Sequence, residues 1–416
     1  MGGGLMQLVA YGAQDIYLTG NPQITFFKVV YRRHTNFSME SIEQTFNGSP
    51  DFGKKVTVTV SRNGDLITKV YLQTDLPDVA ATASGFSWVE EVGHFLISSV
   101  EVEIGGQRID KHYGRWLSIW SSLTLESGKT DGYNNMIGNT SALHGNGSAA
   151  GTNETLAGET LYIPLQFWFC RNAGLALPLI ALQYHEVKFN IEFAALADLL
   201  DATYNSYTGT PALENTSLYI DYIYLDTDER RRFAQTSHEY LIEQLQFTGD
   251  ESLSGQNNKV KLNFNHPCKE LIWVVQADET TGNNFTDAAN GSGSNPCASA
   301  KLQLNGHDRF SQRNGRYFNL VQPFQHHSNT PATGINVYSF ALKPEDHQPS
   351  GSANLSRIDN ATLQLNITSA ANALSNKVVA IYAVNYNVLR IMSGISNCII
   401  FIIIWTTTCS TELFCY

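Results

Sequence analysis

Charged residues and cysteines are scarce in this chain. Asp, Glu, Lys and Arg make up 16% of its 416 residues, and neither end carries a Lys/Arg-rich arm. Neutralising a phosphate backbone requires clustered cations, so the net charge of −11 argues against direct binding of nucleic acid. The six cysteines include no Cys-x-x-Cys pair, which favours a reducing compartment and argues against structural zinc.

Targeting and membrane-spanning segments are also missing. The opening residues contain no basic region followed by a long apolar run, so the sequence predicts no secretory signal. The apolar run from Cys398 to Trp405 is far shorter than the roughly 20 residues that a bilayer-spanning helix needs. We therefore expect a chain that does not span a membrane.

Motifs for catalysis and metal binding are absent too. The eleven histidines include no His-x-His pair of the kind that two-domain cupin metal enzymes use, and no Gly-x-Ser-x-Gly nucleophile elbow occurs. The segment from Gly48 to Lys54 imitates a phosphate loop, but Lys55 stands where the Mg²⁺-binding hydroxyl belongs. We interpret His326-His327 as a polar loop. The sequence predicts no catalytic, cofactor-binding or metal-binding residues, although carboxylates scattered through the loops leave a glycosidase-type pair open.

Alternation of apolar and polar residues is the dominant pattern. It places Val56, Val58 and Val60 on one face of a predicted strand, and this period of two is typical of half-buried antiparallel strands. One short helix is predicted near residues 113–124, and Trp116, Trp120, Trp168 and Trp273 are expected to pack in the core. The predicted strands are 54–61, 99–104, 160–169, 185–193, 218–225, 259–264, 301–305 and 336–342.

The two halves of the chain resemble each other at a separation of about 200 residues. Residues 100–116 match 300–318, including a Gly-Arg-aromatic triplet at 114–116 and 315–317. Weaker matches pair 55–67 with 259–272 and 187–191 with 363–367. These matches indicate that one β-domain is used twice.

Each half has the length and strand number of an eight-stranded jelly roll rather than of a seven-stranded immunoglobulin-type sandwich. The sequence therefore predicts an all-β chain of two tandem eight-stranded antiparallel jelly rolls, a double jelly roll. The boundary should fall in the charged stretch 226–240. We interpret Arg230-Arg231-Arg232, which follows three acidic residues, as part of a solvated or self-paired linker.

Long polar segments at 127–158 and 277–298 are expected to be loops that decorate the domains or form contacts. Eleven Asn-x-Ser/Thr sequons occur in the chain, a number that an Asn-rich composition also produces by accident. Five of them lie in these two segments and are candidate glycosylation sites: Asn139, Asn146, Asn153, Asn284 and Asn290.

Several long motifs, in order along the chain, closely resemble the major capsid proteins of nucleocytoplasmic large DNA viruses, and the algal-virus members look nearest. The resemblance implies a structural double jelly-roll protein that is not an enzyme and needs no cofactor. It implies homotrimeric, pseudo-hexagonal capsomers in an icosahedral virion capsid. The motifs are residues 7–42, 61–72, 102–114, 174–188, 238–249, 262–273, 303–310, 348–363 and 382–394.

The resemblance also implies partners and a division of the chain. The partners would be other copies of the chain, then neighbouring capsomers, and minor capsid proteins beneath the shell. A viral membrane would lie nearby, and assembly would take place in the cytoplasm of the infected host cell. The implied segments are an inner N-terminal arm (1–24), jelly roll 1 (25–225), a linker (226–237), jelly roll 2 (238–394) and an atypical C-terminal tail (395–416).

Two alternatives stay open at this stage. Residues 395–416 depart from the family, whose members tend to end shortly after the motif at Gly394, so this tail is either a frameshifted end or a partner- or membrane-contacting segment. The rival function is that of a jelly-roll carbohydrate-binding or glycoside-hydrolase-like protein that uses loop aromatics and carboxylates.

Overall fold

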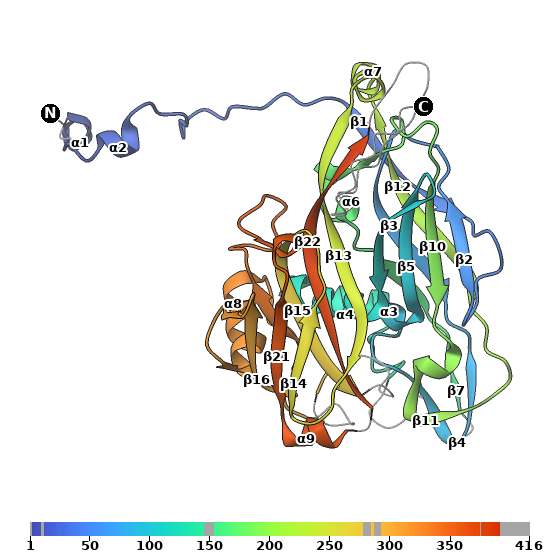
Figure 1. The fold of residues 1–416 in the computed structure, drawn as a ribbon. Coiled ribbons are helices and arrows are strands. Elements are labelled where there is room, and N and C mark those ends of the chain that lie inside the picture. Colours follow the sequence, from blue (N-terminus) through green and yellow to red (C-terminus); the bar gives the residue numbers. More distant parts are fainter. Residues whose placement is uncertain are drawn as a thin grey trace, which may run out of the picture. The chain divides into compact units, whose positions relative to one another are not determined.

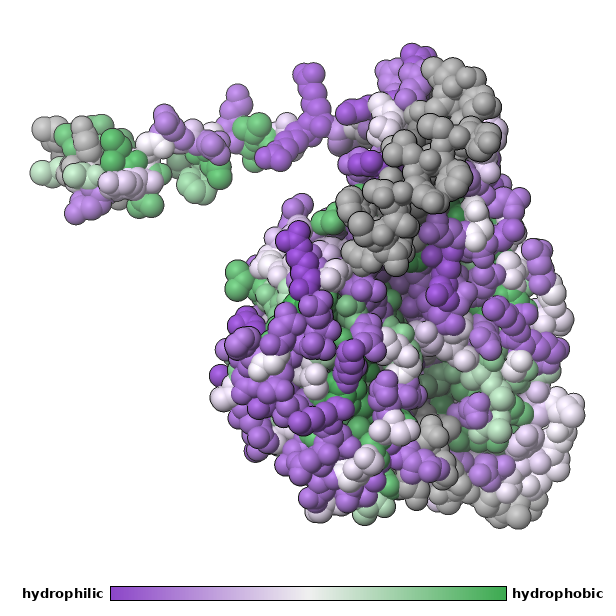
Figure 2. Space-filling model, in the orientation of Figure 1, coloured by the Kyte–Doolittle hydropathy of each residue, from purple (hydrophilic) through white to green (hydrophobic). Residues whose placement is uncertain are grey.

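The computed structural model describes residues 2–9, 12–144, 154–277, 284–286, 293–374 and 376–391. The chain divides into two units, one up to Asn36 and one from Phe37 onward. The first unit contains two short helices, α1 (Gly3–Val9) and α2 (Ile16–Thr19). Its large apolar side chains are exposed, and Figure 2 shows apolar residues along this segment.

A five-stranded and a four-stranded antiparallel sheet form the first half of the second unit (Figure 1). The alternating valines predicted from the sequence lie between the two sheets. Val56 and Val58 are buried, as are Val100 and Val102 on another strand of the same sheet. Sheet A has the order β1 (Phe37–Gln44), β12 (Glu214–Leu225), β3 (Leu66–Asp75) and β8 (Thr160–Pro164), with β9 (Leu177–Pro178) beside β3. Sheet B has the order β2 (Lys55–Thr59), β10 (Val187–Phe193), β5 (Ile97–Ile104) and β6 (Gln107–Tyr113).

Connections of this half carry a third small sheet and several short helices. The sheet has the order β11 (Leu200–Thr208), β4 (Val79–Trp88) and β7 (Thr155–Leu156). The helices are α3 (Val92–Leu96), α4 (Gly114–Thr124), η1 (Ser127–Lys129), α5 (Thr130–Ile137), α6 (Trp168–Arg171), η2 (Ala173–Leu175) and η3 (Leu196–Leu199).

Two predictions for this half are wrong in detail. The strand predicted over 160–169 ends at Pro164, and Trp168 and Phe169 are buried in helix α6 instead. Proline has no N–H with which to continue a ladder of hydrogen bonds, so the chain leaves the sheet there. The segment predicted as a loop from 127 begins with η1 and α5, because Ile137 and Leu143 are buried and hold it against the domain.

The second half repeats the pair of sheets. Sheet D has the order β13 (His238–Ser252), β22 (Lys377–Ile391), β15 (Pro267–Ala277) and β19 (Asn336–Ser339), with β20 (Ala353–Asn354) beside β15. Sheet E has the order β14 (Asn257–Leu262), β21 (Ala361–Ile367), β16 (Cys297–Leu304) and β17 (His307–Asp308), with β18 (Arg313–Asn314) beside β16. The helical elements are α7 (Thr227–Gln235) before β13, the π-helical turn η4 (Tyr317–Val321), α8 (Gln322–His326), η5 (Leu355–Arg357) and α9 (Ser369–Ala373).

The two halves share one strand order. The short side strands β9, β18 and β20 are left out, and the remaining strands of the four large sheets are numbered along each half. Sheets A and D then both have the order first, eighth, third, sixth, and sheets B and E both have the order second, seventh, fourth, fifth. The three sequence repeats fall on corresponding strands: β5 with β16, β2 and β3 with β14 and β15, and β10 with β21. This order confirms the prediction of two eight-stranded jelly rolls, called here the first and the second jelly roll.

Candidate assembly surfaces and glycosylation sites

The first jelly roll is fastened to the second by helix α4. Gly114 begins the helix beside the carbonyl oxygens of His94 and Ile97, where an added Cβ would overlap them. From this position α4 lies against the outer face of sheet D, the face turned away from the core of the second jelly roll (Figure 1). The buried side chains that meet there are Trp116, Ile119, Trp120 and Leu123 of α4 and Ile272, Val274, Val337, Ala380, Tyr382 and Val384 of sheet D.

Tryptophan burial agrees with the prediction from sequence. Trp116 and Trp120 belong to the cluster between the jelly rolls, Trp168 to the first core and Trp273 to the second core. These rings therefore stabilise the fold instead of forming a sugar-stacking platform.

Polar contacts run along the same junction. Gln244 Nε2 donates to the carbonyl of Ile109 at 2.6 Å, and the backbone N–H of Leu245 donates to Asp110 Oδ1 at 3.1 Å. Arg115 in the first turn of α4 pairs with Asp250 of β13 at 2.8 Å. Each of these contacts involves a residue of β13. This strand, which begins the second jelly roll, therefore lies along one end of the first jelly roll.

A buried charge cluster completes the junction. Glu243 of β13 accepts from Lys269 Nζ at 2.8 Å and from Arg171 Nη1 at 3.1 Å, and the Lys269 side chain is fully buried. The Arg171 guanidinium also lies 4.1 Å from the ring centroid of Trp120. No sequence pattern predicts this cluster, because its members come from three separate segments of the chain.

His326 is the last residue of helix α8, and the side chain of His327, which follows it, is buried between two carboxylates, so the interpretation of His326-His327 as a polar loop is wrong. The Nε2 of His327 lies 2.8 Å from Glu270 Oε2 and its Nδ1 lies 2.9 Å from Glu345 Oε1. Burial alone would lower the pKa of His327, but the two carboxylates outweigh it and raise the pKa to about 9. The described residues contain no group of three or more His, Cys, Asp or Glu arranged to hold a metal ion.

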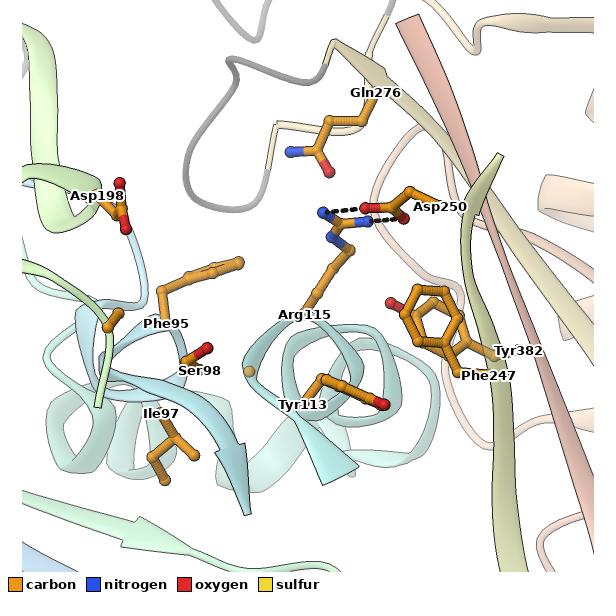
Figure 3. A pocket seen from close by; sticks show the side chains of 12 residues that line it. Phe95, Ile97, Ser98, Tyr113, Arg115, Asp198, Phe247, Asp250, Gln276 and Tyr382 are labelled. Carbon is orange, nitrogen blue, oxygen red and sulfur yellow. Dashed lines mark hydrogen bonds and ion pairs between the residues drawn. The ribbon is translucent and has the colours of Figure 1, made fainter. Parts of the chain in front are cut away.

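A cavity of about 300 Å³ opens beside α4 at the junction. Figure 3 shows the Arg115–Asp250 ion pair on its wall, next to Phe247 and Tyr382. Burial would lower the pKa of Arg115, but Tyr382 and Asp250 raise it, so the guanidinium stays charged. Because Asp250 is held by Arg115, the described walls do not present the two free carboxylates that glycoside hydrolysis uses.

The candidate glycosylation sites are only partly within the described residues. Asn139 follows the left-handed Gly138 that ends α5, and its Nδ2 donates to Asn134 Oδ1 at 3.3 Å. Asn284 Oδ1 accepts from the Oγ1 of its own sequon residue Thr286 at 2.8 Å, and both side chains are half-buried. Asn146, Asn153 and Asn290 lie outside the described residues, as does the whole tail from 395.

The predicted charged boundary is helical. Residues 227–235 form α7, in which Asp226 caps the N-terminus by accepting from Thr227 N–H. Arg230 pairs with Asp65 of the first jelly roll at 3.0 Å, so the basic run is in part paired with that domain. No helix among the described residues is long and apolar enough to cross a membrane.

Comparisons with known proteins agree over nearly the whole chain. Residues 25–226 match the family model "Major capsid protein N-terminus", and residues 229–397 match "Large eukaryotic DNA virus major capsid protein". The major capsid protein of Pyramimonas orientalis virus is 60% identical, over 95% of this chain and 99% of the relative. That of Paramecium bursaria Chlorella virus 1 is 44% identical over the same shares of both chains.

A solved structure gives the same result for the fold. The PBCV-1 virus capsid, a quasi-atomic model, superimposes with a TM-score of 0.77 at 39% identity, covering 90% of this chain and all of that one. The double jelly-roll fold, its strand order and the sequence identity all indicate the same role. The chain is a structural component of an icosahedral virus capsid and not an enzyme. The chain belongs to the family of large eukaryotic DNA virus major capsid proteins.

Proposed function

We propose that three copies of this chain close into a homotrimeric capsomer of pseudo-hexagonal outline, and that these capsomers tile the icosahedral shell. The single observation that supports this most is the repeated strand order, with two like jelly rolls held together by α4. Three such chains around a threefold axis present six similar walls to their neighbours. In this proposal residues 25–225 and 238–394 act as the two walls and 226–237 links them.

The test is the size and outline of the protein in solution. Light scattering of the purified full chain should give three times the chain mass of 46.1 kDa, and negative-stain images should show hexagonal particles. A monomer that is retained on carbohydrate columns would instead support the rival sugar-binding function. A stable dimer would contradict the trimer.

We also propose that the segment before Thr25 is an inner arm that contacts minor capsid proteins or neighbouring capsomers near the viral membrane. Leu5, Met6, Leu8 and Tyr17 are more than half exposed, and a run of exposed apolar side chains marks a surface that a partner covers. Deletion of residues 2–24 should leave the trimer intact but prevent its incorporation into particles. Loss of the trimer itself would contradict this role.

We propose glycans on the polar segments 127–158 and 277–298, which would face outward in this capsomer, at Asn139, Asn146, Asn153, Asn284 or Asn290. Mass spectrometry of peptides from particle-derived protein should find sugar on these segments. Glycans found only elsewhere would contradict the proposal. The same peptides would show whether the residues after 394 are present in the particle-derived protein. We also propose that assembly takes place in the host cytoplasm, and imaging of tagged protein in infected cells would test this.

A further inference from the structure

Helix α4 has a counterpart in the second jelly roll that lacks a matching cover. The helical run of η4 and α8 follows the same predicted repeat, with Gly315-Arg316-Tyr317 aligned with Gly114-Arg115-Trp116. The two glycines are equivalent in space. A Cβ on Gly114 would overlap the carbonyl oxygen of Ile97, the first residue of β5, and one on Gly315 would overlap that of Cys297, the first residue of β16.

The inward faces of the two helices are also equivalent. Leu117 of α4 is buried in the core of the first jelly roll, and Phe318, at the same offset, is buried in the core of the second. Each helix therefore places one large apolar side chain in the core of its own domain. The opposite face of the helix is left to contact something else.

The outward faces of the two helices differ sharply in their exposed fraction. Ile119, Trp120 and Leu123 of α4 are 0%, 4% and 0% exposed because sheet D covers them. The residues that align with them when Gly315 is matched to Gly114 are Leu320, Val321 and Phe324, which are 38%, 40% and 82% exposed. Figure 1 shows α8 on the flank of the second jelly roll that lies away from α4.

The sheet that corresponds to sheet D has an aromatic outer face. Sheet A corresponds to sheet D by strand order, and Tyr71 and Tyr219 face each other in register on its outer side. Their rings stack at 5.2 Å between centroids, and Tyr162 lies 6.3 Å from Tyr71. Tyr162 is 39% exposed, so the three rings together form an aromatic surface, and a contiguous apolar surface of this kind marks an interaction site.

Charge at the two surfaces is complementary as well. Within the chain, Arg115 at the start of α4 pairs with Asp250 on β13. Arg316 occupies the corresponding place in the second jelly roll, is exposed, and has no ion pair within the described residues. The strand that corresponds to β13 is β1, whose Glu43 lies in register with Tyr219 on the outer face of sheet A.

We propose that the helix face formed by Leu320, Val321 and Phe324 docks on the outer face of sheet A, at Tyr71, Tyr162 and Tyr219, of a second copy of this chain. The contact reproduces between chains the α4–sheet D contact within the chain. It joins two different surfaces, so it repeats head to tail and closes into a ring when the rotation allows. This inference rests on the proposed homotrimer and assigns its contact residues.

The first test introduces a charge at the centre of the helix face. Phe324→Asp in the full chain should raise the concentration at which the trimer dissociates about tenfold or more, because large aromatic side chains dominate interface energies. Tyr184→Asp is the matched control, since Tyr184 is also largely exposed but lies outside both surfaces, and it should leave the trimer unchanged. Far-ultraviolet circular dichroism of the Phe324→Asp chain should match wild type, because the site is exposed.

The second test identifies the partner surface. A chain with both Phe324→Cys and Tyr219→Cys, treated with a bismaleimide cross-linker, should give covalent dimers and trimers beyond the wild-type background. Each single cysteine variant should stay at that background, because a head-to-tail contact does not bring two copies of one residue together. Cross-linking of Phe324→Cys with itself, or a Phe324→Asp trimer as stable as wild type, would overturn this inference while leaving the trimer standing. A monomeric wild-type chain would overturn the trimer itself.

Discussion

Lys269 Nζ lies 2.8 Å from Glu243 Oε1, and the lysine side chain is fully buried. The second oxygen of the same carboxylate accepts from Arg171 of the first jelly roll. The Glu243 carboxylate thus neutralises the buried Lys269 of its own jelly roll and also binds Arg171 of the first jelly roll. A buried charge is tolerated only while it is paired, so the two jelly rolls are coupled through Glu243.

The first prediction removes that carboxylate. Glu243→Gln should destabilise the protein by about 3–5 kcal/mol, because it leaves Lys269 buried without a counter-charge. The measurement is the free energy of unfolding from urea titration. Glu239→Gln on the same strand is the control: its carboxylate is 58% exposed and pairs with Arg390, so its loss should cost about 1 kcal/mol or less. Equal effects of the two substitutions would contradict the role given to Glu243.

The contrast between these residues shows what sequence could predict. Alternation placed Val56 and Val58 inside because the period of a strand is two, whatever the rest of the chain does. Glu243 contacts residues 26 and 72 positions away, and no local pattern encodes such pairs. Strands β4 and β11 were missed for a related reason: their register shifts twice, which erases a regular alternation.

The second prediction concerns pH. The folded-state pKa of His327 is raised to about 9 by Glu270 and Glu345, above its ordinary value near 6.5. The stability that protonated His327 contributes is therefore fully present below about pH 6.5 and is lost as the pH rises through about 9. The difference in unfolding free energy between wild type and His327→Gln should shrink over this window. A difference in unfolding free energy that stays constant from pH 6 to 10 would contradict this role of His327.

The third prediction tests the apolar junction. Leu123→Ala should destabilise the protein by about 2–5 kcal/mol, because Leu123 is fully buried between α4 and sheet D and a cavity would remain. Leu342→Ala is the control, since Leu342 is 73% exposed, and it should change stability by about 0.5 kcal/mol or less. Thermal unfolding followed by circular dichroism measures both. A small effect at Leu123 would mean that α4 is not what fastens the two domains.

The helix itself was predictable, but its partner was not. The segment 113–124 carries apolar residues on more than one face, which is enough to predict a buried helix. Which sheet covers Trp116 and Leu123 depends on how the two domains pack, and the sequence repeat alone does not specify that. The repeat aligns Gly315 with Gly114, but the helix that follows Gly315 was not predicted, and the difference in exposure between Leu123 and Phe324 is a property of the folded chain alone.

The fourth prediction uses the paired glycines. Gly315→Ala should destabilise the second jelly roll, because the new Cβ would overlap the Cys297 carbonyl where β16 begins and would push η4 and α8 away from the sheet. Gly132→Ala in α5 is the matched control, since nothing lies within 4 Å of its added Cβ, and it should stabilise that helix by up to about 1 kcal/mol. Urea unfolding measures both changes. If the helix position also sets the assembly surface, Gly315→Ala should weaken the trimer at urea concentrations where the chain is still folded. A variant that loses neither stability nor assembly would show that this close approach does not fix the helix.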